Sequence, residues 1–154
     1  MLSILLVGGI EDNTKTLDPT GGDVYEGQPL SLDPITGYLK PSNDSLPVYG
    51  LSKLNANKYI NLVSSGVEGY ASGKITVAKK NVVRIVAETF NQVEVMGTNA
   101  SITVALYTTE VFRPGNELYV SGTGLITKTP GTHLLGTCNN LPAVDGYMEI
   151  DLAI

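Results

Sequence analysis

The side chains able to do chemistry are few in this chain, and their spacing matches no catalytic pattern. There is one histidine, His133, one cysteine, Cys138, and fifteen carboxylates. A nucleophilic mechanism needs a base, so a Ser-His or Cys-His pair would depend on His133 alone. His133 follows the turn formers Pro130-Gly131-Thr132, and Cys138 ends an apolar run. We interpret His133 as a turn or strand-edge residue and Cys138 as a buried small hydrophobe.

The carboxylates are scattered along the chain. Only Glu11 and Asp12 are adjacent among the pairs that could share acid-base work, and Glu149 and Asp151 alternate on a face that is ordinarily exposed. The stretch from 18 to 26 lacks the ordered Asp, Asn and Glu ligands of a calcium loop, and a single cysteine excludes multi-cysteine zinc sites. The sequence therefore predicts no enzyme, no metal and no cofactor, with a small carboxylate-only hydrolase as a remote alternative.

One glycine-rich stretch is superficially similar to a phosphate-binding loop. The stretch runs from Gly69 to Ile75. The leading glycine of the motif would fall at position 68, where this chain has Glu68, and Ile75 stands where Ser or Thr would hold magnesium. A strand is also predicted to follow where the motif requires a helix. We interpret these glycines as a tight turn before a strand.

Composition and charge narrow the class of protein further. The chain has 154 residues, enough for one domain with a sizeable core. Its net charge is −5, and the densest basic spot is Lys79-Lys80 with Arg84 nearby, which we interpret as a solvated loop and strand end. Nucleic-acid binding needs clustered Lys and Arg, so we exclude it. Charged residues are only 16% of the chain, against roughly 25% in an average domain, which is typical of a surface covered by neighbours.

Two distant stretches share one pattern of turns and strands. The first runs from Glu26 to Leu51 and the second from Pro114 to Thr137. Each has a glycine turn, a short alternating strand, a second glycine turn, a second strand and a third strand near a glycine. The matched glycines lie 88, 87 and 86 positions apart (27/115, 37/124 and 50/136). We expect two related β lobes within one domain.

Further β patterns fill the second half of the chain. Strands are predicted at Lys74–Ala78, Val82–Ala87 and Ser101–Tyr107, with hairpin-like turns at Lys79–Asn81 and Gly97–Asn99. At the C-terminus Met148, Ile150 and Leu152 alternate with Tyr147, Glu149 and Asp151, which predicts a half-buried strand. The fold class is therefore all-β, an antiparallel barrel or sandwich with little helix.

The remaining segments carry weaker signals. Residues 11–24 are rich in turn formers, which predicts a loop. Between Ser52 and Ser65 either a helix or an irregular connection fits the pattern. Residues 1–23 are thus taken as an apolar N-terminal segment and loop, and 24–154 as a single β domain with the internal repeat at about 26–51 and 114–137. Residues 1–7 are too short to span a bilayer and lack the features of a targeting signal, so they form a strand or an arm on a partner.

With these motifs in view, the chain resembles the decoration (cement, or minor capsid) proteins of tailed bacteriophages. The resemblance rests on the repeated Glu/Pro-Gly-x-x-Leu-x-Leu/Val pattern with its glycine turns. It covers about two thirds of the chain and includes the strand entry at 68–77 and the C-terminal ending at 146–151. The matching stretches are Val24–Leu51, Glu68–Val86 and Arg113–Leu152.

This resemblance implies a structural virion protein on the outer surface of the major capsid lattice, made in the host cytoplasm. It implies the major capsid protein as partner and a homo-oligomer, with a trimer favoured over a dimer, and no nucleic acid or membrane. A tail, head-fibre or other appendage module is the alternative, and the tyrosine content would suit carbohydrate binding in such a module. The candidate capsid or protomer contacts are Leu2, Ile4, Leu6, Tyr49, Tyr70 and Tyr119.

Overall fold

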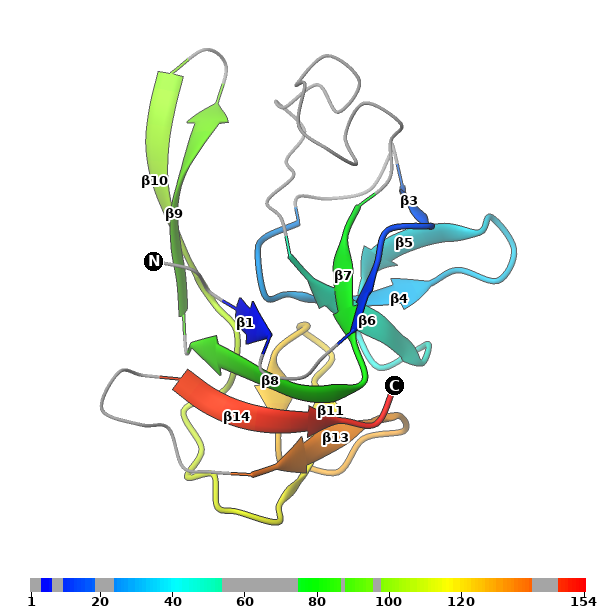
Figure 1. Ribbon diagram of the computed structural model, residues 1–154, viewed down its shortest axis with the longest axis vertical. Coiled ribbons are helices and arrows are strands. Elements are labelled where there is room, and N and C mark those ends of the chain that lie inside the picture. The colour runs from blue at the N-terminus through cyan, green and yellow to red at the C-terminus, as the bar shows by residue number, and fades with distance from the viewer. Residues whose placement is uncertain are drawn as a thin grey trace.

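The protein is built from β-strands. The computed structural model describes residues 4–6, 10–18, 24–53, 75–86, 88–95, 98–139 and 147–154. Every regular element in these ranges is a strand, so the predicted all-β class is confirmed (Figure 1). The strands form two six-stranded sheets and a two-stranded hairpin. Both large sheets are open, so the arrangement is sandwich-like and the barrel alternative is wrong.

Sheet 1 has the strand order β2-β7-β6-β4-β5-β3, and sheet 2 has the order β1-β8-β14-β13-β11-β12. Neighbouring strands are antiparallel except for β3 and β5. The strands of sheet 1 are β2 (Ile10–Asp12), β7 (Val77–Lys79), β6 (Val48–Ser52), β4 (Pro29–Leu32), β5 (Tyr38–Pro41) and β3 (Thr16–Leu17). Those of sheet 2 are β1 (Ile4–Leu6), β8 (Asn81–Val86), β14 (Tyr147–Leu152), β13 (Leu134–Cys138), β11 (Glu117–Val120) and β12 (Ile126–Thr127).

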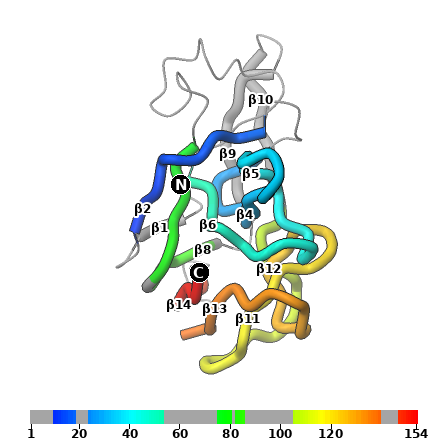
Figure 2. Tube along the Cα trace, turned by 90° about the vertical axis from the view of Figure 1, so that its right-hand side faces the viewer, coloured from blue at the N-terminus to red at the C-terminus, as the bar shows by residue number. Residues whose placement is uncertain are grey.

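The two sheets repeat one another strand for strand. The order β2-β7-β6-β4-β5 in sheet 1 corresponds to β8-β14-β13-β11-β12 in sheet 2. The parallel pairing of β3 with β5 also has a counterpart, because Tyr107 forms a parallel bridge with Ile126. We call sheet 1 the first copy and sheet 2 without β1 the second copy. Figure 2 shows the blue-to-cyan first copy above the yellow-to-red second copy.

The turns that open each copy are also the same. Gly27 and Gly115 both have a φ of +89°. The Gly27 amide donates to the Ser52 carbonyl at 2.7 Å, and the Gly115 amide donates to the Cys138 carbonyl at 2.8 Å. Since each bond ties the turn to the end of the third strand of its copy, these turns close the three-stranded unit that the sequence repeat predicted.

A β-bulge occupies the same place in both copies. The register of β4 against β6 shifts between Leu30 and Ser31, which leaves Tyr49 as the extra residue. The register of β11 against β13 shifts in the same way and leaves Leu135 as the extra residue. A bulge bends the strand that carries it and increases the local twist.

The glycine after each bulge is required by the neighbouring strand. A Cβ atom on Gly50 would lie 2.9 Å from the Ala78 carbonyl oxygen in β7. On Gly136 it would lie only 2.2 Å from the Asp151 carbonyl oxygen in β14. The bulged strand and its neighbour therefore approach so closely that no side chain fits between their backbones.

Each copy has its own buried core built from corresponding positions. In the first copy Leu30 of β4 and Leu39 of β5 are fully buried, and so are Leu118 of β11 and Ile126 of β12 in the second. A further group from sheet 1, consisting of Val48, Leu51 and Ala78, packs into the second core and joins the two sheets. The six first-copy positions are Leu17, Val24, Leu30, Leu39, Ile75 and Val77. Five of them have counterparts in the second core, Phe112, Leu118, Ile126, Met148 and Ile150, whereas strand register matches Leu17 to Tyr107, which packs against that core.

The remaining hairpin consists of β9 (Glu88–Val95) and β10 (Thr98–Ala105), which pair only with each other among the described strands. In the chain the hairpin lies between β8 and β11 of the second copy, and it extends away from both sheets (Figure 1). Thr98 pairs with Val95 and Asn99 with Glu94, so these two residues belong to β10 and not to the predicted turn.

Several expectations need correction. Residues 11–24 were predicted as a loop, but they contain part of β2 and all of β3, because tertiary pairing with β7 and β5 outweighs their turn-forming composition. The predicted hairpin turn at Lys79–Asn81 is a crossing between the two sheets, made at Lys80 with a φ of +56°. Ile4–Leu6 form a strand that pairs with β8. Residues 54–74, with the helix alternative, lie outside the described residues.

The close approach at Gly136 leads to a stability prediction. Gly136→Ala should lower the free energy of unfolding by about 3 kcal/mol, because the new methyl group meets backbone atoms that cannot yield without moving a strand. Gly122→Ala is the matched control, since a Cβ there meets nothing within 4 Å, and its effect should stay within about 0.5 kcal/mol. Urea unfolding measures both, and equal midpoints for the two variants would contradict the prediction.

Candidate functional site

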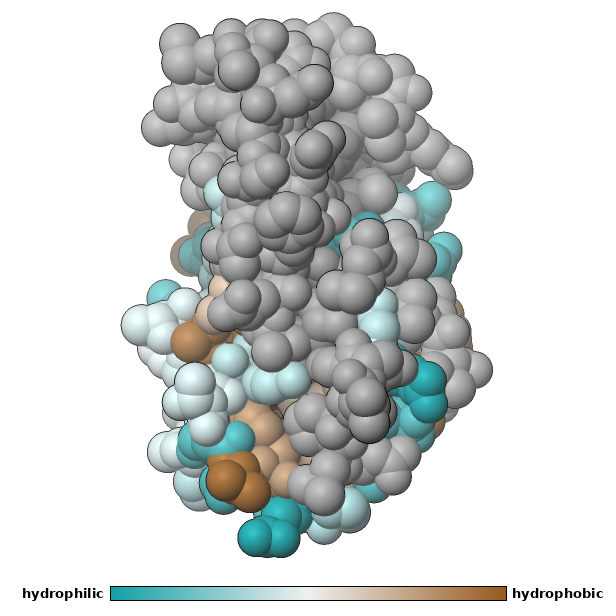
Figure 3. Space-filling model, turned by 90° about the vertical axis from the view of Figure 1, so that its left-hand side faces the viewer, coloured by the Kyte–Doolittle hydropathy of each residue, from teal (hydrophilic) through white to brown (hydrophobic). Residues whose placement is uncertain are grey.

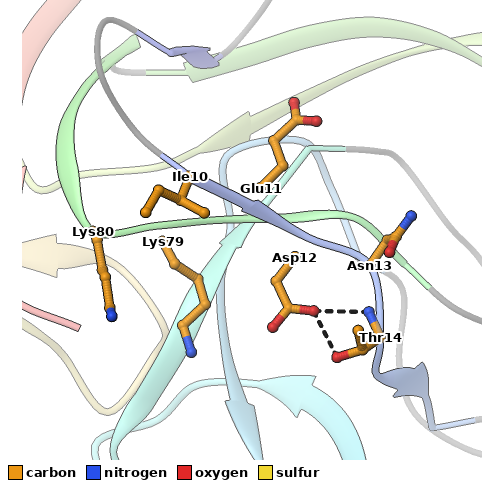
Figure 4. Close-up of a pocket in the computed structure, with 7 residues that line it drawn as sticks. All are labelled: Ile10, Glu11, Asp12, Asn13, Thr14, Lys79 and Lys80. Atoms are coloured by element: carbon orange, nitrogen blue, oxygen red, sulfur yellow. Dashed lines mark hydrogen bonds between the residues drawn. The ribbon is translucent and has the colours of Figure 1, made fainter.

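A small pocket lies where sheet 1 meets the crossing to sheet 2. It is lined by Ile10 to Thr14 together with Lys79 and Lys80, and has a volume of about 290 Å³ (Figure 4). The pairing of Ile10 with Lys79 brings these two segments together. Small-molecule sites usually have roughly 300–1,000 Å³, so this pocket is at the lower limit and suits one or two side chains of a partner.

Two of the lining residues, Asp12 and Lys79, contact Tyr49, which is not itself part of the lining. The Tyr49 hydroxyl donates to Asp12 Oδ2 at 2.6 Å, and the Lys79 ammonium lies 3.6 Å from the centre of the Tyr49 ring. Thr14 donates to Asp12 Oδ1 from its amide at 2.8 Å and from its hydroxyl at 2.7 Å. These contacts join residues far apart in the sequence into one cluster of acid, ring and base.

The hydrogen bonds fix the ionisation of the cluster. The Tyr49 hydroxyl, followed by the Thr14 hydroxyl and amide, lowers the pKa of Asp12 from 3.8 to about 2. Burial, followed by the hydrogen bond to Asp12, raises the pKa of Tyr49. A carboxylate with so low a pKa is a poor general base near neutral pH, and a phenol with a raised pKa is a poor acid. The arrangement therefore suits recognition better than acid-base catalysis.

The rim of the pocket combines apolar and charged groups. Ile10 is 51% exposed, and Lys80 is exposed beside it. Glu11 points to the opposite side of β2 from Asp12 and Lys79, as Figure 4 shows, and lies 3.8 Å from Lys53. A partner that places an aliphatic group on Ile10 and an acidic group near the lysines would fit this rim.

The second copy has no equivalent site. The bulge residue is Tyr49 in the first copy, half-buried with its hydroxyl on Asp12, but Leu135 in the second copy, where it is fully buried. A tyrosine can pack its ring and hydrogen-bond its hydroxyl at the same time, which a leucine cannot do. The positions that correspond to Asp12 and Lys79 by register are the buried Val83 and Leu152, so all three members of the cluster are apolar in the second copy.

Two other carboxylates organise loops. Glu110 accepts hydrogen bonds from the hydroxyls of Thr108, Thr127 and Thr129 and from the Lys128 amide at 3.2 Å. The Thr108 hydroxyl, followed by that of Thr127, lowers the pKa of Glu110 from 4.5 to about 2. Three of these donors lie at the end of β12 and just after it, and Thr108 lies in the segment before β11, so this carboxylate ties the two segments together.

Asp44 joins the first copy to the second. Its carboxylate accepts the Thr132 amide at 2.9 and 3.1 Å and the His133 amide at 3.1 Å, and the Thr132 bond lowers the pKa of Asp44. Gly131 lies against this carboxylate, because a Cβ there would be 2.8 Å from Asp44 Oδ2. His133 is half-buried in the loop before β13, as a turn residue, and Cys138 is buried with 1% exposure.

The structure separates the residues predicted as contacts. Tyr49 belongs to the pocket site, whereas Tyr119 lies on β11 in the other sheet and donates to Glu117 at 2.9 Å. Ile4 and Leu6 lie in β1, opposite Ile85 and Val83 of β8. Leu2 and Tyr70 are outside the described residues.

Sequence reasoning missed Asp12 and Lys79 as partners of Tyr49. Asp12 is 37 residues from Tyr49, and no pattern in the sequence joins them. Lys79 and Lys80, the densest basic spot in the sequence, both line the pocket, but Arg84 is not among its lining residues. Arg84 lies 3.4 Å from Glu149 across β8 and β14.

Among the described residues no group of three or more His, Cys, Asp and Glu side chains could hold a metal ion. Within the same ranges no helix has the length and hydrophobicity needed to cross a membrane. No protein-family model matches the chain, and a search of curated proteins gives no match.

The Tyr49 hydroxyl should contribute measurably to stability. Tyr49→Phe removes a donor to the Asp12 carboxylate and should lower the free energy of unfolding by about 1–2 kcal/mol. Tyr119→Phe is the matched control, because its hydroxyl bonds an exposed carboxylate, and it should cost less than about 0.5 kcal/mol. The midpoints of urea unfolding measure both effects. A larger loss of stability for Tyr119→Phe than for Tyr49→Phe would refute this account of the site.

Glu110 should make stability depend on acid pH. Because the folded-state pKa of about 2 lies below the ordinary 4.5, its contribution is complete above about pH 5 and is lost as the pH falls toward 2. Glu110→Gln should be less stable than the wild type at pH 7 and lose less stability between pH 5 and pH 2. Parallel profiles for the wild type and Glu110→Gln, from urea unfolding at each pH, would exclude this role for Glu110.

Proposed function

We propose that this chain is a structural virion protein that binds the outer surface of a tailed-phage capsid lattice and stabilises the head. The main support is the repeat. The turn-and-strand pattern that resembles phage decoration proteins falls on two three-stranded units with the same pairing, the same bulge and the same left-handed glycines. The segments that carry the resemblance are thus the folding units of the protein.

The described surface is also of a kind that suits many weak contacts. Charged residues are 16% of the chain, and the coloured part of Figure 3 shows pale, teal and brown residues side by side. Exposed large apolar side chains occur at separate places, among them Ile10 of β2 with 51% exposure and Val111, in the segment before β11, with 61%. Contacts of this size are weak singly, but a lattice repeats them, and an oligomer that engages several sites gains avidity.

The carboxylate-centred contacts favour a binding role for a second reason. Asp12, Asp44 and Glu110 all have lowered pKa values because they accept bonds from loop amides and hydroxyls. They hold neighbouring segments in place, and a carboxyl group with a lowered pKa is a poor general base near neutral pH. Rigid loops lose little conformational entropy on docking, which suits a protein that reinforces a shell.

The test is a titration of the purified protein onto expanded capsids from its source virus that lack it, followed by co-sedimentation. Saturation at a fixed ratio to the major capsid protein is expected, and sedimentation velocity of the free protein gives its oligomeric state. An absence of binding would overturn the proposal and favour the appendage alternative. A glycan array with wild type, Tyr38→Ala and Tyr119→Ala then tests carbohydrate binding.

A further inference from the structure

The most exposed large apolar side chain in the described part of the protein lies at the tip of a projecting hairpin. Strands β4 and β5 are joined by the turn from Asp33 to Gly37, which extends from the body of sheet 1 (Figure 1). Ile35 in this turn is 93% exposed, and Tyr38 beside it is 36% exposed. An isoleucine so exposed adds almost nothing to stability through burial.

The turn that carries Ile35 is held rigidly. Asp33 Oδ1 accepts the Ile35 amide at 2.9 Å and the Thr36 amide at 3.4 Å. The Gly37 amide donates to the Asp33 carbonyl at 2.8 Å, and Gly37 has a φ of +73°. Lys40 lies 3.2 Å from the second carboxylate oxygen of Asp33, which neutralises the turn locally. The backbone that carries Ile35 is therefore held in place on a tip whose two charges are paired.

The second copy provides an internal comparison. Its corresponding turn, from Ser121 to Gly124, is one residue shorter and is also closed by a glycine, with the Gly124 amide donating to the Ser121 carbonyl at 2.9 Å. The Ser121 hydroxyl takes the place of the Asp33 carboxylate and accepts the Leu125 amide at 3.1 Å. The exposed residues of this turn are Gly122 and Thr123. A glycine-closed turn at this place in the copy consequently does not require an apolar side chain at its tip.

We infer that the β4–β5 tip is a docking knob, in which Ile35 inserts into an apolar recess of the capsid lattice protein. This inference rests on the proposed function and adds the contact that carries it. A preorganised aliphatic side chain on a neutral projection fits an uncharged concave surface, because docking buries Ile35 without desolvating a charge or ordering a loop.

A second copy of this chain fits the knob less well. Two pockets in the described part carry charged side chains in their lining, Asp12, Lys79 and Lys80 in one and Asp44 in the other. Ile35 inserted into either would displace water from those charges without giving them a new partner. A single isoleucine is also too little apolar surface to hold a membrane.

The experiment compares Ile35→Ser with the wild type in the capsid titration, with Thr123→Ser as the control in the corresponding turn and Ile35→Leu as the conservative variant. Ile35→Ser should raise the half-saturating concentration by about 10-fold or more, while Thr123→Ser and Ile35→Leu stay within about 2-fold of the wild type. Urea unfolding should give equal midpoints for all four proteins, since both positions are exposed.

Each other outcome has a definite meaning. Equal capsid binding by Ile35→Ser and the wild type would overturn the knob and leave the proposed function standing. Failure of the wild type to bind capsids would overturn both. Loss of self-association by Ile35→Ser, seen in sedimentation velocity without a loss of capsid binding, would assign the tip to a second copy and refute the inference.

Discussion

At Gly136 the backbone of β14 lies so close to the bulged strand β13 that a Cβ atom would be 2.2 Å from the Asp151 carbonyl oxygen. The same approach occurs at Gly50, where a Cβ atom would be 2.9 Å from the Ala78 carbonyl oxygen of β7. A bulge concentrates twist at one point of a strand, and here a glycine next to the bulge lets the neighbouring strand follow that bend. Without this contact β7 and β14 could not cover the buried residues of their copies.

The duplicated cores follow from that geometry. Val77 and Ile150 lie in the strands held against the two glycines, and both are fully buried among residues that correspond between the copies. The copies differ where they meet. Val48 of the first copy is 6% exposed and packs into the shared cluster, whereas its counterpart Leu134 is 41% exposed. The two copies are therefore not equivalent at this position, because Val48 of β6 faces the other copy whereas Leu134 of β13 faces solvent.

Carboxylates complete the structure where backbone pairing ends. Asp12 binds a tyrosine of β6, Glu110 binds the threonines around β12, and Asp44 reaches from the first copy to the loop before β13 of the second. Each accepts several donors, and charge-assisted bonds of this kind are stronger than neutral ones. The result is a rigid framework whose polar groups serve its own loops.

The sequence by itself determined the all-β class, the three-stranded repeat and the glycines at 27, 37 and 50 with their counterparts at 115, 124 and 136. It could do so because alternation, turn chemistry and positive φ are local properties. It also determined that Cys138 and the C-terminal alternation of Met148, Ile150 and Leu152 are buried. Only the tertiary structure decided that the repeat extends to the outer strands, since β2 and β8 share no pattern and are related by pairing alone. It likewise made Lys80 a crossing between sheets and brought Asp12, Tyr49 and Lys79 together, because hydrogen bonds and ring contacts between distant residues depend on strand register, which no local pattern encodes.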